Sequence, residues 1–195
     1  MSTLDETEYL LQAIEALDDK LTGIAQPFEL NVIGGFAMLL NGIRPSVQGA
    51  TYTDVDYIGA GFPPLIELAV KEVGIAYGLG KDWINNDALL YGSTIEELEI
   101  LTGPLHFEKI RELKVITIKA LIPEDLLRMK LLAVDTALMA VDAGDEFTRS
   151  KDMPDIKYLV EFLGITSIEL LKTATTSVDI APRTYEFITK RVFLD

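Results

Sequence analysis

The sequence predicts an α+β fold, in which a mixed β-sheet flanked by helices is followed by a helical C-terminal subdomain. Apolar runs of strand length occur at residues 30–33 and 115–122, and amphipathic segments with helical spacing separate them. From Pro154 onward only helical signals remain. We therefore expect a sheet-containing core over residues 1–122 and a helical subdomain over residues 123–195 that packs on it.

The first half of the chain is expected to alternate helices and strands. Residues 3–24 place seven large apolar side chains at helical spacing, which predicts an amphipathic helix. A buried strand over residues 30–33 and a short helix over residues 36–40 should follow. Two prolines then precede an apolar segment over residues 65–73, which we expect to form a helix that ends at Gly74.

The second half begins with a segment, residues 95–100, whose pattern fits a strand or a short helix. Strands are expected over residues 107–110 and 115–122, and a long helix over residues 124–143 should end at Gly144. Three more helices are expected over residues 155–162, 167–174 and 182–193.

Composition limits the classes of function. With 195 residues, of which 49% are hydrophobic and 25% charged, the chain can bury a substantial core. It contains no cysteine, which excludes disulfides, thiolate catalysis and cysteine zinc sites, and its single histidine excludes a zinc site of several histidines. We find neither a signal peptide nor an apolar membrane span, so we expect no membrane partner and a cytoplasmic location.

The formal net charge of −14 disfavours extended RNA or DNA as a ligand, because nucleic-acid binding depends on clusters of Lys and Arg. The charge is uneven. Residues 106–130 carry six Lys and Arg side chains against four acids. This stretch could hold a triphosphate, and a solvated strand and helix face explains it equally well.

The most informative segment runs from Asn31 to Ile58. An apolar strand leads into Gly34-Gly35, whose backbone N–H groups can approach a phosphate closely, and a short helix follows. The next strand carries Asp54 and Asp56, which share one face because side chains alternate along a strand. Two adjacent carboxylates suit Mg²⁺, or Mn²⁺, held together with substrate phosphates. The segment therefore predicts a site for a nucleoside triphosphate (NTP) and a metal ion.

Each half of this pattern also has a simpler explanation. A pair of glycines after a strand is usually a turn, and an Asp-x-Asp sequence is common on solvated strands or at a structural cation site. The order of the elements favours the functional interpretation, since a strand, a glycine turn, a helix and a strand with paired aspartates occur in succession.

With this order of motifs, the chain resembles the nucleotidyltransferase superfamily with the polymerase-beta-like fold. Within it, the chain is most similar to the bacterial group that includes AbiEii-type toxins and uncharacterised nucleotidyltransferase-like proteins. Three later segments strengthen the resemblance, and together the matches span residues 31–163. These segments are Trp83-Ile84-Asn85, Pro123 to Lys130, and Ser150 to Ile156.

The resemblance implies that Asp54 and Asp56 are the catalytic and metal-binding residues. It implies that the nucleotide-binding residues are Gly34, Gly35, Lys130, Lys151 and Asp155. Lys130, near the start of the long helix, could place an ammonium on a phosphate. It could equally be a surface lysine. Lys151 and Asp155 are four residues apart and could also form a stabilising pair on one helix face.

Two departures from the family pattern bear on activity. Relatives commonly carry Arg-x-Thr before the aspartates, where this chain has Ala50 and Tyr52, with Arg44 upstream. Active members also use a third acid on a later strand, and residues 115–122 contain none. Glu108 and Glu112 could reach the site, although a role as solvated surface acids fits them better.

The expected function is transfer of a nucleoside monophosphate from an NTP to a hydroxyl acceptor, which could be a small molecule, a protein or an RNA end. The alternative is a catalytically reduced member of the superfamily that keeps the fold and acts as a regulatory or toxin–antitoxin protein. Its partner would then be a cognate antitoxin-like protein. A third, weaker interpretation is an interaction module in which the acidic pair is a structural cation site.

Overall fold

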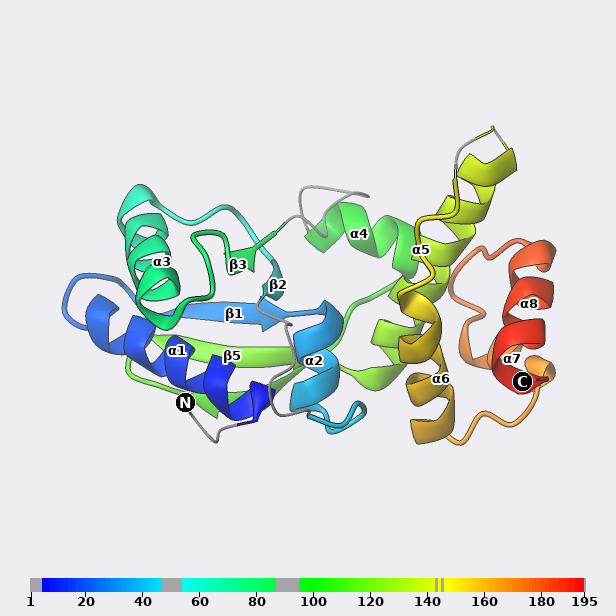
Figure 1. Ribbon diagram of the computed structural model, residues 1–195, viewed down its shortest axis with the longest axis horizontal. Helices are drawn as coiled ribbons and strands as arrows, with labels where there is room; N and C mark the ends of the chain where they lie inside the picture. The colour runs from blue at the N-terminus through cyan, green and yellow to red at the C-terminus, as the bar shows by residue number, and fades with distance from the viewer. Residues whose placement is uncertain (1–4, 47–53, 87–94, 143, 145, 195) are drawn as a thin grey trace. The chain divides into compact units, whose positions relative to one another are not determined.

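The computed structural model describes residues 5–46, 54–86, 95–142, 144 and 146–194. The chain divides into two compact units, which are described separately. The first consists of residues 1–97 and 107–121, and the second of residues 98–106 and 122–195. The predicted α+β class, with a mixed sheet and flanking helices, is confirmed (Figure 1).

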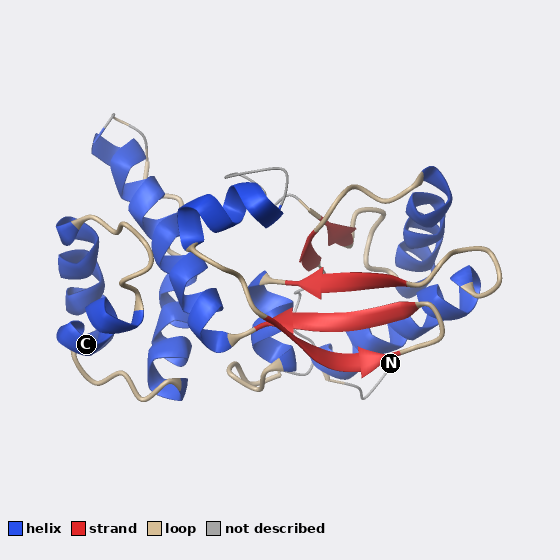
Figure 2. Cartoon of the chain, turned by 180° about the vertical axis from the view of Figure 1, so that it is seen from behind, coloured by secondary structure: helices blue, strands red, loops and turns tan. Residues whose placement is uncertain are grey.

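The sheet of the first unit has five strands in the order β3-β2-β1-β5-β4 (Figure 2). β1 is parallel to β5 and antiparallel to β2, β2 is parallel to β3, and β4 is antiparallel to β5. The sheet is therefore mixed, as predicted. The strands are β1 (Phe28–Val32), β2 (Val55–Ile58), β3 (Ile84–Asn85), β4 (Phe107–Glu112) and β5 (Ile116–Leu121).

Along β1 and β5, buried side chains alternate with more exposed ones, as expected for a sheet that buries one face. Leu30 and Val32 of β1 are buried, as are Ile116 and Ile118 of β5. The helix α1 (Glu6–Leu21) covers one face of the sheet, as the opposite views in Figures 1 and 2 show, and packs against α3 (Pro64–Tyr77). The apolar side chains of the two strands and of α1 form the core of this unit.

A buried aspartate connects α1 to the turn between β4 and β5. Asp18 lies on the buried side of α1, and its carboxylate accepts hydrogen bonds from three consecutive backbone N–H groups. The donors are Lys114 at 3.0 Å and Val115 and Ile116 at 2.8 Å each. Asp18 therefore satisfies the backbone of a turn that is distant in sequence.

Two helices of the first unit differ from their predicted bounds. α2 (Gly34–Leu40) begins two residues earlier than expected. α3 continues through Gly74 and ends only at Gly78, which has the left-handed φ of +68°. A Cβ atom on Gly74 would lie 2.0 Å from the carbonyl oxygen of Gly80 and 2.4 Å from the Trp83 ring. Gly74 is therefore required for close packing, and it does not end the helix.

Residues 95–100, for which a strand or a short helix was expected, form the start of the helix α4 (Ile95–Thr102), which begins in the first unit and ends in the second. The rest of the second unit is also helical. α5 (Pro123–Asp142) contacts α6 (Asp152–Phe162) and α8 (Pro182–Ile188), and a π-helical turn, Thr189–Phe193, follows α8. α7 (Ile168–Ala174) is capped by Ser167, whose hydroxyl accepts from the Leu170 N–H. Among the helices in the described part of the chain, none has the length and apolarity to cross a membrane.

Candidate functional site

The glycine turn and the second aspartate of the predicted site lie against each other. β1 and β2 are antiparallel, and the Ile33 N–H donates to the Asp56 carbonyl oxygen at 2.9 Å. Gly34 follows with φ of +64°, and a Cβ atom on it would lie 2.6 Å from Asp56 Oδ2. Glycine is strongly favoured at this position, since a side chain would strain the backbone and displace the carboxylate.

β2 begins at Val55, so Asp54 lies directly before the strand and not within it as predicted. Val55 is fully buried in the core, whereas Asp54 is exposed and Asp56 is half-buried. The Val55 N–H donates to the carbonyl oxygen of Trp83 at 2.6 Å, which fixes the start of β2 against the segment that leads into β3. Trp83 itself is buried, and its Nε1 donates to the Val70 carbonyl oxygen at 2.8 Å. Trp83 is therefore a core residue.

Arg44 reaches the glycine turn from the chain after α2. The Ile43 N–H donates to the Met38 carbonyl oxygen at 2.9 Å, which turns the chain back along the helix. Arg44 Nη1 then lies 3.4 Å from the position that a Cβ atom on Gly35 would occupy. A guanidinium is thus present beside the turn. Ala50 and Tyr52, which stand where relatives carry Arg-x-Thr, lie outside the described residues.

Glu6 is an acidic residue of this region that the sequence analysis missed. Its Oε1 lies 3.7 Å from Arg44 Nη2, and the two side chains are 4% and 11% exposed. Burial raises the pKa of Glu6, Arg44 lowers it, and the charges of Asp5 and Asp54 raise it further. The available signal was periodicity, because Glu6 lies four residues before Leu10 on the buried stripe of α1.

The other predicted site residues belong to the second unit. Lys130 is 16% exposed, and its ammonium lies 2.6 Å from Asp152 Oδ1 and 2.8 Å from Asp155 Oδ2. Burial lowers the pKa of Lys130, but the two carboxylates outweigh it, so the pKa is raised. Lys151 is an exposed residue directly before α6. The structure thus pairs Asp155 with Lys130, and two of the family-like segments meet here.

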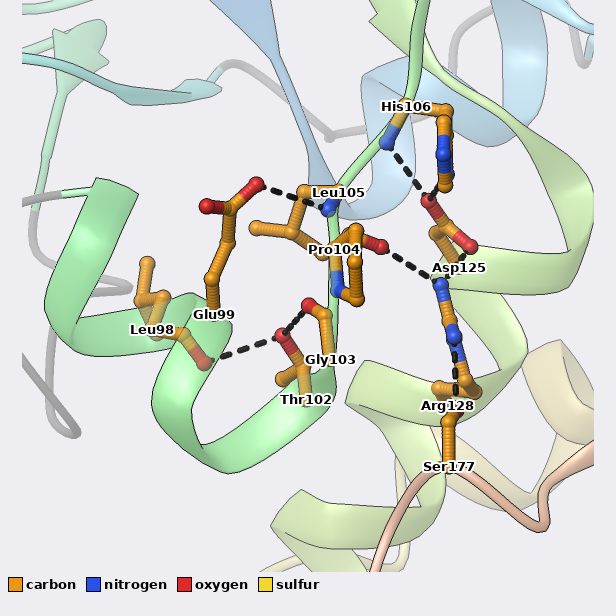
Figure 3. A network of polar contacts seen from close by, with 10 residues as sticks. All are labelled: Leu98, Glu99, Thr102, Gly103, Pro104, Leu105, His106, Asp125, Arg128 and Ser177. Carbon is orange, nitrogen blue, oxygen red and sulfur yellow. Dashed lines mark hydrogen bonds and ion pairs between the residues drawn. The ribbon is translucent and has the colours of Figure 1, made fainter.

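A second polar network explains other residues of the segment Pro123 to Lys130 (Figure 3). The buried Asp125 carboxylate accepts from the His106 backbone N–H at 2.6 Å, lies 3.0 Å from His106 Nδ1, and pairs with Arg128. Arg128 also donates to the Pro104 carbonyl oxygen at 2.8 Å and to Ser177 Oγ at 2.6 Å. Asp125 and Arg128 therefore fix the chain around α5, which is a structural role.

The locally positive stretch does not offer an uncompensated positive surface. Each of its six cationic side chains lies in an ion pair with an acid. The pairs are Lys109–Glu112, Arg111–Glu15, Lys114–Asp19, Lys119–Glu29, Arg128–Asp125 and Lys130–Asp152. Arg128 and Lys130 have side chains that are only 10% and 16% exposed, so these two do not lie on a solvated face, and Glu112 is a surface acid bonded to Lys109. The triphosphate interpretation of this stretch stays a prediction.

In the ranges that the structure describes, no group of three or more Asp, Glu, His or Cys side chains is arranged to hold a metal ion. The predicted magnesium site requires only two carboxylates, because Mg²⁺ commonly combines one or two of them with waters and substrate phosphates. Comparisons with family models, with curated proteins and with solved structures found no match to this chain. The relationship to nucleotidyltransferases therefore stays a prediction.

Proposed function

We propose that the protein is a magnesium- or manganese-dependent nucleotidyltransferase, which moves a nucleoside monophosphate from an NTP to a hydroxyl acceptor. The observation that carries the proposal is the contact between Gly34 and the Asp56 carboxylate. A turn that needs glycine lies directly against one of two alternate aspartates, so a phosphate at the turn and a cation on the carboxylates would be neighbours.

The residues present fit a divalent cation. Asp54 and Asp56 provide carboxylate oxygens, the ligands that Mg²⁺ and Mn²⁺ prefer. A bound ion would neutralise the charge that develops on the leaving pyrophosphate. Val55, between the two aspartates, is buried, so the alternation of side chains along a strand would direct both carboxylates to the side away from the core.

The glycine turn has a separate role in the proposed reaction. Because the two glycines have no side chains of their own, the backbone N–H groups of Gly34 and Gly35 could donate to the outer phosphates of the NTP and orient them. A hydroxyl acceptor would attack the α-phosphorus, and pyrophosphate would leave. The acceptor could be a small molecule, a protein side chain or an RNA end, and the net charge of −14 ranks RNA lower.

One alternative function has its own support. β5 carries no acid, and the cations of residues 106–130 are already paired with carboxylates. Both observations favour a protein that keeps the fold but has reduced catalysis, and that acts as a regulatory or toxin–antitoxin partner of an antitoxin-like protein. Such a protein could still bind a nucleotide.

Thermal unfolding with Mg²⁺ and each of the four NTPs tests the proposal. A ligand at about 100 times its dissociation constant stabilises the folded state by about 2.7 kcal/mol, which for a chain of this size shifts the midpoint by about 5 to 10 °C. We expect one NTP to produce such a shift only with the metal. Asp54→Asn and Asp56→Asn should abolish it, whereas Asp82→Asn, at an exposed position in the same unit, should not.

Pyrophosphate release then separates the two functions. The transferase is supported if pyrophosphate release requires both Mg²⁺ and an acceptor and is lost in Asp54→Asn and in Asp56→Asn. A metal-dependent thermal shift without release over a panel of acceptors would favour the binding protein. The absence of a shift with any NTP would refute the nucleotide site itself.

A further inference from the structure

We propose that Arg44 binds the triphosphate of the NTP and that Glu6 is a positioning residue for its guanidinium. The inference rests on the proposed function, because it assigns two more residues to the same nucleotide site. Neither residue belongs to the glycine turn or to the aspartate pair, and they come from segments on either side of β1 and α2.

The backbone around Arg44 is fixed at several points. Asn41, which follows α2, donates from Nδ2 to the carbonyl oxygens of Ala37 at 2.8 Å and Leu121 at 3.0 Å. Ser46 Oγ accepts from the Thr7 N–H at 3.2 Å, which ties this segment to the first turn of α1. Arg44 therefore extends from a segment that is bonded to a strand end and to a helix start.

The guanidinium lies where an anion at the glycine turn would need a cation. Arg44 Nη1 and Nη2 lie 3.4 Å and 3.5 Å from the position that a Cβ atom on Gly35 would occupy. The guanidinium is therefore beside Gly35, and we place the phosphate of the proposed nucleotide between the two. Guanidinium is well suited to phosphate, since its planar fork can donate to two oxygens at once.

Glu6, on α1, places a carboxylate beside this guanidinium. Its carboxylate is nearly fully buried and lies 3.7 Å from Arg44 Nη2. A buried ion pair without a short hydrogen bond contributes little to stability, because desolvation of both charges offsets their attraction. In agreement, the pKa of Glu6 is raised despite the neighbouring arginine. Such a costly acid fits a residue that orients the arginine better than one that stabilises the fold.

The test measures binding, by calorimetry with Mg²⁺, of the NTP that stabilises the wild type most and of its monophosphate. We expect Arg44→Gln to weaken NTP binding by about tenfold or more and monophosphate binding by less than about threefold. Glu6→Gln should weaken NTP binding in the same selective way. The double variant should resemble Arg44→Gln alone, because Glu6 acts through Arg44.

Two comparisons separate positioning from a structural role. Arg111→Gln removes an exposed arginine that pairs with Glu15 in the same unit, and it should leave both affinities unchanged. Arg44→Lys keeps the charge but loses the fork, so it should recover only part of the NTP affinity. Equal loss of NTP and monophosphate binding in Glu6→Gln, or additive effects in the double variant, would overturn the proposal.

The same measurements distinguish failure of this inference from failure of the proposed function. If the wild type binds no NTP, both are refuted. If the wild type binds an NTP and Asp54→Asn weakens it while Arg44→Gln does not, only the role of Arg44 and Glu6 is refuted.

Discussion

Asp18 and Asp19 provide a matched test at the scale of single residues. Asp18 is buried and accepts three backbone hydrogen bonds, whereas Asp19 is exposed and pairs with Lys114. We expect Asp18→Ala to lower the free energy of unfolding by about 2 to 4 kcal/mol, because three backbone N–H donors, two of them in buried hydrogen bonds, lose their acceptor.

Asp19→Ala should change the free energy of unfolding by less than about 1 kcal/mol, as for exposed ion pairs generally. Urea denaturation of the two variants at neutral pH measures both values. Similar losses in both would mean that the turn before β5 finds other acceptors.

Among single residues, the sequence predicted those whose amino-acid type by itself indicates a local backbone conformation. The glycines of the turn and the alternation around Val55 follow from backbone geometry, which is local. Glu6, Asp18 and Asp152 were missed, although all three are buried. Their sequence neighbours do not indicate the partners that they meet, because these partners come from distant segments. Glu6 lies beside an arginine, Asp18 accepts from three backbone N–H groups, and Asp152 pairs with a lysine.

At the scale of elements, Gly74 sets the packing between α3 and the loop that leads to β3. Gly74→Ala would bring a methyl group within 2.0 Å of the Gly80 carbonyl oxygen and 2.4 Å of the Trp83 ring. We expect a loss of about 2 to 4 kcal/mol in the free energy of unfolding, since backbone and a buried ring must both move.

Gly61→Ala is the control for Gly74→Ala, because a Cβ atom there would meet nothing within 4 Å. Alanine should be neutral or slightly stabilising at this position, as it restricts the unfolded chain. Thermal or urea unfolding distinguishes the two glycines, and a small effect at Gly74 would mean that α3 can shift outward without cost.

The bounds of elements were predicted less well than their existence. A glycine after an apolar helical run usually ends the helix, yet Gly74 lies inside α3 because Trp83 occupies the space beside it. β3 was not predicted, because two residues carry no periodicity, and only its pairing with β2 makes it a strand. Tertiary contacts decided both cases.

At the scale of the whole molecule, the net charge of −14 should make stability depend on salt. Repulsion among acids destabilises the compact state, and ions screen it with a Debye length of about 10 Å at 0.1 M. We expect the unfolding midpoint at neutral pH to rise by a few degrees between about 10 and 300 mM NaCl. The rise should be smaller near the pI of about 4.4, where the net charge is low. A midpoint that falls with salt would mean that the surface ion pairs outweigh the net repulsion.

The α+β class could be predicted because helical and strand periodicity are local properties of the sequence. The strand order could not, since it depends on pairing between distant segments such as β1 and β5. For the same reason the approach of Asp56 to Gly34 could be expected from two successive strands, whereas the position of Arg44 beside the turn and of Glu6 beside Arg44 could not.

The bonds from Asp18 to the turn before β5 have a consequence for the order in which the chain assembles. The bonded residues are 96 to 98 positions apart, and a ribosome adding about 5 to 20 residues per second would take about 5 to 20 s to make that stretch. During this time α1 has been synthesised without the segment that it must hold. The N-terminal helix, although first in the chain, can reach its native surroundings only after more than half of the protein exists.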